Sequence, residues 1–134
     1  MDLQKPLPVA SDTSRPFWDG LVAGKVNVQQ CDACHGWVFY PRSRCSHCLS
    51  DRLLWREVSG RGTLYTFTIA RAATAPHFAD EVPQKLAVVQ LEQGVRLTTT
   101  LVNVAEADIR IGMPVKPYFD VVGPDTVLLR YQPV

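Results

Sequence analysis

The four cysteines of this chain stand in two pairs, and this pattern constrains the fold more than any other feature. Two residues lie between Cys31 and Cys34, two lie between Cys45 and Cys48, and ten residues separate the pairs. Each C-x-x-C pair forms a tight turn that presents two thiolates, so two facing turns provide four sulfur ligands for a tetrahedral metal. A spacer this short favours a compact zinc ribbon or a rubredoxin-like pair of knuckles.

The predicted role of the metal is structural. Four thiolates complete the coordination sphere of zinc and leave no position for an activated water. Iron is the main alternative, because a tetrahedral four-thiolate site also accepts iron. Disulfide pairing is a second alternative, disfavoured in a reducing compartment. His35 and His47 adjoin the cysteines, and we expect both to be exposed residues of the knuckles rather than ligands.

Composition bounds the class of protein. The chain has 134 residues, 46% of them hydrophobic, which indicates one compact unit or two very small ones. Its formal net charge is +1, and a four-thiolate zinc site would add about −2. This balance argues against a nucleic-acid or anionic-membrane partner. No apolar run has the length of a transmembrane helix, and residues 1–10 lack the apolar core of a signal peptide, so we expect a cytoplasmic protein.

The N-terminal part of the chain predicts a polar arm over residues 1–13 and then one short helix. Ser14 is the predicted N-cap, and Gly24 suits the C-terminal cap. Phe17 and Trp18 begin an apolar face that must be buried, either against the chain's own body or against a partner. A helix this short is only marginally stable by itself, so it depends on the packing of these aromatic side chains.

The remainder of the chain predicts a mainly β fold. Strands of the ribbon are expected at 26–30 and 36–40. Beyond the second knuckle the expected strands are 53–58, 63–71, 85–92, 95–103, 114–122 and 126–131, with turns at 59–62 and 93–94 and a short helix at 105–109. In the second of these strands, alternation predicts Tyr65, Phe67 and Ile69 on one face, with Leu64 on the other. Five or six short strands with one short helix in this order are typical of a Greek-key OB-fold barrel.

Four features in order carry a resemblance to a known family. They are Phe17-Trp18 with Gly24, the two cysteine pairs, the junction Val58-Ser-Gly-Arg-Gly-Thr-Leu-Tyr-Thr-Phe67, and the segment Ile109-x-Ile-Gly-Met-Pro-Val115. Together they make residues 15–134 similar to the acyl-CoA-associated zinc-ribbon/OB-fold proteins, long catalogued as a domain of unknown function. The resemblance implies an N-terminal arm and helix over 1–25, a rubredoxin-like zinc ribbon over 26–52, and an OB-fold barrel over 53–134.

The resemblance also implies a function. Members of this family accompany thiolase-like, aldolase or hydratase enzymes that act on acyl-CoA thioesters, which implies a non-catalytic accessory subunit that helps to bind or shield the CoA ester. One departure concerns the ligand. Family members often carry a Pro-aromatic pair before the third barrel strand, whereas this chain has Val82-Pro83-Gln84-Lys85. If that aromatic side chain contacts the CoA ester in family members, this chain lacks the contact at this position.

Several residues are candidates for contact with the partner or the ligand, each with a structural alternative. The arginines near the second knuckle and the barrel could contact CoA phosphates or an acidic surface, or they could balance the dianionic metal site and remain solvated. The long connection 70–84 carries His77 and Phe78, and connections of this length are often functional. The candidate residues are Phe17, Trp18, Arg42, Arg44, Arg61, His77 and Phe78.

Two other functions compete with the accessory role. A nucleic-acid-binding ribbon/OB module would use Tyr65 and Phe67 for stacking, but such grooves are basic and this chain is nearly neutral. An enzyme in its own right is the least favoured, because the sequence carries no glycine-rich phosphate loop, nucleophile elbow or paired carboxylates.

Overall fold

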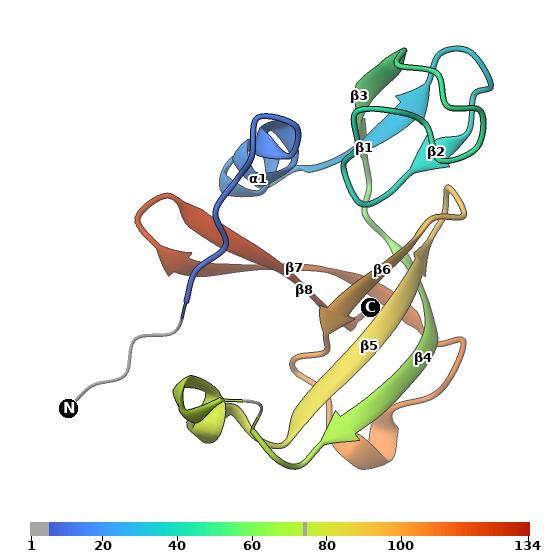
Figure 1. Ribbon diagram of the computed structural model, residues 1–134. Coiled ribbons are helices and arrows are strands. Elements are labelled where there is room, and N and C mark those ends of the chain that lie inside the picture. Colours follow the sequence, from blue (N-terminus) through green and yellow to red (C-terminus); the bar gives the residue numbers. More distant parts are fainter. Residues whose placement is uncertain (1–5, 74) are drawn as a thin grey trace.

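The computed structural model describes residues 6–73 and 75–134 and shows a small ribbon sheet, one helix and a β-barrel (Figure 1). The helix lies between the ribbon and the long hairpin at the end of the chain. This is the mainly β architecture predicted from the sequence, with one short N-terminal helix, a zinc ribbon and an OB-like barrel. No helix in the described part of the chain is long and apolar enough to cross a membrane.

The N-terminal helix α1 spans Arg15–Val22 and buries one side of its short cylinder. Phe17 and Leu21, one turn apart, form an apolar cluster with Val127 of the barrel. Ser14 occupies the N-cap position, but its hydroxyl accepts a hydrogen bond from the backbone N–H of Ser11 (3.0 Å) instead of capping the helix. Gly24 ends the helix with a φ of 76°, the left-handed conformation expected of a C-terminal glycine.

The ribbon is a three-stranded antiparallel sheet in the order β2-β1-β3. Strand β1 (Val26–Cys31) pairs with β2 (Trp37–Val38) on one side and with β3 (Leu53–Val58) along its whole length on the other. Residues 53–58 were predicted as the first barrel strand, and the observed pairing places them in the ribbon sheet instead. This occurs because an apolar strand directly after the second knuckle can return along β1.

The barrel contains five strands in the order β6-β5-β4-β7-β8. Their bounds are Gly62–Ala70 for β4, Gln84–Leu91 for β5, Arg96–Thr100 for β6, Pro114–Gly123 for β7 and Thr126–Pro133 for β8. A parallel bridge between Leu101 and Tyr131 joins the two ends of this sheet, as OB-fold closure requires. Two 3-10 helices interrupt the connections, η1 (Pro76–Glu81) and η2 (Glu106–Asp108), the second within the predicted helix at 105–109.

A β-bulge in β4 changes which residues face the core. The pairing of β4 with β5 shifts between Leu64 and Thr66, so the exposed Tyr65 and Thr66 both lie outside. The predicted alternation, with Tyr65 on the face of Phe67 and Ile69, is therefore wrong at Tyr65 and holds from Phe67 onward. Leu64 is almost fully buried.

The ribbon and the barrel share one apolar core. Val26 and Val28 of β1 belong to the same buried cluster as Val89 and Val115 of the barrel. Above this core the junction is fixed by Tyr131, whose buried hydroxyl donates to the Gly60 carbonyl oxygen (2.5 Å). The junction is also close-packed at Gly62, where a Cβ would lie 2.3 Å from the Gln90 carbonyl oxygen. The ribbon is therefore held at a defined angle to the barrel.

Candidate metal centre and aromatic pocket

The two knuckles place four sulfur atoms around one point. Cys31 is the last residue of β1 and Cys34 lies in the turn that follows, whereas Cys45 and Cys48 come from the second turn, before β3. All four sulfur atoms lie within 4.8 Å of one another. The Sγ atoms of Cys31 and Cys48 are 3.6 Å apart, as are those of Cys34 and Cys45. A tetrahedron of sulfurs at the Zn–S distance of about 2.3 Å has edges of about 3.8 Å, so the donor set fits zinc.

Backbone amides prepare the buried sulfurs for the thiolate state. The N–H groups of Ala33 and Cys34 point at Cys31 Sγ from 3.4 and 3.5 Å. The hydrogen bond from the Cys34 amide lowers the pKa of Cys31 most, burial raises it, and the hydrogen bond from the Ala33 amide lowers it further. The resulting pKa of Cys31 is about 6. Burial favours the neutral thiol of Cys45, but hydrogen bonds from the N–H groups of Cys48 and His47 and from the thiols of Cys34 and Cys48 together outweigh it, so the pKa of Cys45 is also lowered.

The thiolate of Cys34 requires the metal. A backbone hydrogen bond from Gly36 favours the thiolate of Cys34, yet desolvation and the neighbouring thiols raise the pKa of Cys34 to about 12. Four negative charges cannot accumulate at these distances without a cation. Zinc binding to this site would therefore displace protons, and its affinity would depend on pH.

The knuckles repeat one backbone pattern. His35 and Leu49 each follow a cysteine pair, each has a left-handed φ (63° and 66°), and each N–H donates to the carbonyl of the first cysteine of its pair. His35 thus occupies a conformation in which glycine is common. His47 approaches Gly36 closely, and its Nε2 lies 3.1 Å from the Trp37 carbonyl oxygen. His47 therefore connects the two knuckles.

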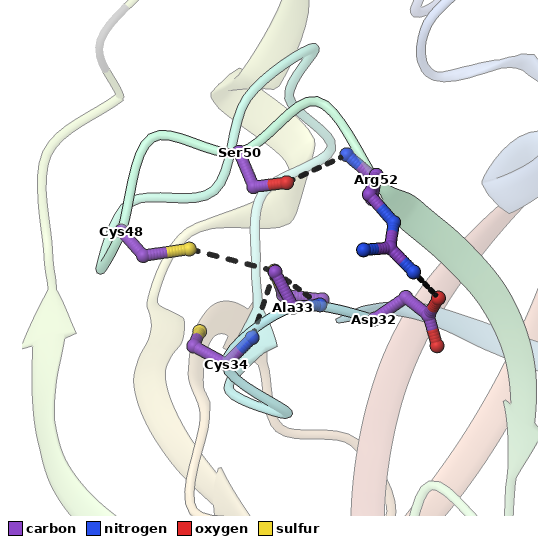
Figure 2. Close-up of polar contacts among 7 residues, drawn as sticks. Asp32, Ala33, Cys34, Cys48, Ser50 and Arg52 are labelled. Atoms are coloured by element: carbon purple, nitrogen blue, oxygen red, sulfur yellow. Dashed lines mark hydrogen bonds and ion pairs between the residues drawn. The ribbon is translucent and has the colours of Figure 1, made fainter.

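An exposed ion pair closes the outer side of the ribbon. Arg52 donates from its guanidinium to Asp32 at 2.5 Å, while its own carbonyl accepts from the Asp32 N–H at 2.8 Å (Figure 2). Ser50 accepts from the Arg52 N–H on the same segment. Cys48 points from the second knuckle toward the first. These contacts bind the start of β3 to the first knuckle, so Arg52 has a structural role.

The residues predicted to contact a partner or ligand lie in separate places. Phe17 is 4% exposed and covered by the chain's own residues, so its ring packs beneath the surface and cannot contact a partner directly. Trp18 is half-buried, and its Nε1–H donates to the Tyr40 hydroxyl (3.1 Å). Arg42, Arg44 and Arg61 are exposed, and Arg44 donates to the Leu49 carbonyl oxygen.

The η1 segment stands apart from these residues. His77 and Phe78 are half-buried, with ring centroids 6.4 Å apart. Figure 1 draws η1 and α1 at opposite ends of the barrel. A docking surface containing both Trp18 and Phe78 would have to extend along the barrel.

Sequence reasoning missed a cavity of about 520 Å³ between α1, the end of β2 and the barrel. We call it the aromatic pocket, because four aromatic side chains form one wall: Phe17, Trp18, Phe39 and Tyr40. Its other walls are residues Arg96–Thr100 of β6 and Leu128–Arg130 of β8. Phe39 and Tyr40 fall within the strand predicted over 36–40, of which only Trp37–Val38 pairs as β2, and their distance from Arg96 in the sequence gives no signal of the pocket.

The fold and the four-cysteine site define a zinc-ribbon/OB-fold protein. Residues 18–53 match the family described as "ChsH2, rubredoxin-like zinc ribbon domain", and residues 55–120 match "ChsH2, C-terminal OB-fold domain". A "DUF35 domain-containing scaffold protein" of Methanothermobacter thermautotrophicus is 33% identical over 92 residues, with 67% of this chain and 68% of that protein covered. The chain belongs to the DUF35 family.

Two further relatives extend the comparison. A "Probable enoyl-CoA hydratase alpha subunit" of Thermomonospora curvata is 33% identical over 111 residues, which cover 83% of this chain and 34% of that protein. This chain thus spans about a third of that relative's length. A chain of the solved structure "Ltp2-ChsH2(DUF35) aldolase" superposes with a TM-score of 0.83 at 30% identity, covering 94% of this chain and 98% of the other.

Proposed function

We propose that this chain is a non-catalytic accessory subunit of an enzyme that acts on acyl-CoA thioesters. The observation that supports this most is the match to the chain of the Ltp2-ChsH2(DUF35) aldolase structure, because it covers nearly all of both chains. A hydratase subunit and a scaffold protein among the relatives support the same role. The partner would be an aldolase-, hydratase- or thiolase-like enzyme.

The metal would serve this role by fixing shape. Cys31, Cys34, Cys45 and Cys48 fill a tetrahedral sphere, so a metal held by all four has no position for substrate or water. Zinc would join the two knuckles and hold β2 and its following residues, Phe39 and Tyr40, against α1. Iron in the same site would have the same effect on shape.

A contribution to ligand binding belongs to the same proposal. Lys25, Arg61 and Lys116, with the single acidic residue Glu57, line a hollow of about 280 Å³ at the junction of ribbon and barrel. None of the three makes an ion pair with a described residue, so phosphate groups of a CoA ester would find free cations there. Arg42, Arg44, His77 and Phe78 are further candidates for contact with the partner.

The test is to isolate the epitope-tagged chain from its native cells at low ionic strength and to identify co-purifying proteins by mass spectrometry. We expect a stoichiometric enzyme of the thiolase, aldolase or hydratase class, whose turnover of an acyl-CoA substrate requires this chain. Binding of single-stranded oligonucleotide that weakens steeply with salt, without such an enzyme, would support the nucleic-acid alternative instead.

A further inference from the structure

The aromatic pocket has a wall made by the main chain of β6. Five consecutive residues, Arg96–Thr100, line it, whereas alternate residues of a strand point their side chains to opposite faces. In the described chain β6 pairs with β5 alone apart from the bridge at Leu101, so β6 is an edge of the sheet. The Val102 N–H donates to the Tyr131 carbonyl (2.8 Å), and by alternation the main-chain groups of Thr98 and Thr100 point toward the pocket.

The opposite wall is rigid. Phe17 packs edge-on against Phe39 and Tyr40, with ring centroids 5.6 and 6.1 Å away. Trp18 is fixed by its hydrogen bond to the Tyr40 hydroxyl. Tyr40 is nevertheless 45% exposed at the mouth of the pocket. The aromatic wall is therefore ordered before anything binds, which lowers the entropic cost of binding.

Arg96 is a cation held in place without a carboxylate. Its guanidinium lies 3.8 Å from the centroid of the Tyr65 ring, and its Nε donates to the Gln90 side-chain oxygen (3.0 Å). Within residues 6–73 and 75–134, its two terminal nitrogens have no hydrogen-bond partner. Arg130, the other cation of the pocket, already pairs with Asp120 (2.6 Å). An incoming carboxylate would therefore meet Arg96.

The gap between β6 and β8 is too narrow for an added strand. Thr99 Oγ1 donates directly to the Leu129 carbonyl oxygen at 2.9 Å, so one side chain spans the gap. A strand inserted there would need about 4.8 Å on each side. The pocket instead admits side chains from its open mouth, and its volume of about 520 Å³ is large enough for them.

We propose that the aromatic pocket is the docking site for a segment of the partner enzyme, which inserts an apolar side chain and places a neighbouring carboxylate on Arg96. This inference rests on the proposed function. A protein partner suits the rim, because tryptophan, tyrosine and arginine are the residues that dominate the energetics of protein interfaces. Trp18, Tyr40 and Arg96 line the pocket and supply all three types, and Arg96 is complementary to an acidic residue.

The experiment measures the affinity of the purified partner enzyme for variants of the full-length, zinc-loaded chain by titration calorimetry. Arg96→Glu reverses the charge, and Thr98→Trp fills the mouth of the pocket from an exposed position. We expect each to weaken binding by about thirtyfold or more, the loss typical of an interface hot spot. The control for Arg96 is Arg56→Glu, because Arg56 is also exposed and also donates from Nε to a glutamine (2.7 Å). The control for Thr98 is Thr63→Trp.

The outcomes separate the two proposals. If the wild-type chain binds the enzyme and both pocket variants bind with unchanged affinity, the docking site lies elsewhere and the inference is overturned, even if the pocket then proves to hold a small molecule. A wild-type dimer in solution that Arg96→Glu dissociates would also overturn it, because the occupant would be a second copy. If the wild-type chain binds no acyl-CoA enzyme at all, the proposed function fails first.

Discussion

Replacing Tyr131 with phenylalanine should lower the stability of the ribbon–barrel junction and leave the metal site unchanged. The Tyr131 side chain is fully buried in the shared core, and its hydroxyl donates to the Gly60 carbonyl oxygen at 2.5 Å. Gly60 itself is buried, so the variant leaves this acceptor without a partner and without water. Phenylalanine retains the ring, so the change isolates the hydrogen bond.

The expected loss follows from the unsatisfied carbonyl. A buried acceptor that loses its donor costs about 1–3 kcal/mol. For a chain of 134 residues this corresponds to a decrease in Tm of roughly 3–10 °C. Urea unfolding in zinc-saturated buffer, followed by tryptophan fluorescence, measures the difference directly. Tyr118→Phe is the control, because Tyr118 is 38% exposed on β7, and it should change the free energy of unfolding by less than about 0.5 kcal/mol.

The difference in stability between the wild type and Tyr131→Phe should also depend on pH. Burial raises the pKa of Tyr131 in the folded chain above the ordinary value of 10.0. Above that value the unfolded chain loses the phenolic proton while the folded chain retains it, so the wild type loses stability as pH rises. The advantage of wild type over Tyr131→Phe should therefore shrink above about pH 10. A Tyr131→Phe variant as stable as wild type at neutral pH would refute this account of the junction.

Three other perturbations test the metal site and the packing. Removing the metal with a chelator should unfold the ribbon and release Tyr40 from α1, seen as loss of the near-ultraviolet aromatic signal, whereas retained signal would show that the ribbon folds without metal. Lowering the pH from about 7 to about 5 should release zinc to a chromogenic chelator, because protons compete for the Cys34 sulfur, whose pKa without metal is about 12. Gly62→Ala should destabilise the barrel by about 1–3 kcal/mol, since its Cβ would lie 2.3 Å from the Gln90 carbonyl oxygen. Gly36→Ala should cost less, because the atoms nearest to its Cβ belong to the His47 and Cys34 side chains and not to the backbone.

The metal site could be predicted from the sequence because its ligands are local. Each cysteine pair determines its own knuckle, and ten residues are enough to bring the two knuckles together. The order of strands also predicted the barrel, since alternation and turn residues are local signals. These features depend on neighbouring residues, which is why they could be inferred without the tertiary structure.

Other features depend on contacts between distant segments. Residues 53–58 are compatible with either sheet, and only pairing with β1 assigns them to the ribbon. Tyr65 faces outward because a bulge forms against β5, and no residue type at that point specifies it. The aromatic pocket combines Tyr40 of the ribbon with Arg96 of the barrel, so it exists only after the ribbon and barrel have packed together.

The most direct test of the account is the binding of the acyl-CoA enzyme recovered from native cells to this chain with and without its metal. Calorimetry should show saturable binding by the zinc-loaded chain, loss of binding after zinc removal, and recovery on adding zinc or cadmium, because the metal fixes the shape of the ribbon that carries Phe39 and Tyr40. The chain alone should not turn over the acyl-CoA substrate. Equal binding by the metal-free chain, or turnover by the isolated chain that changes with the metal, would contradict a structural metal on an accessory subunit.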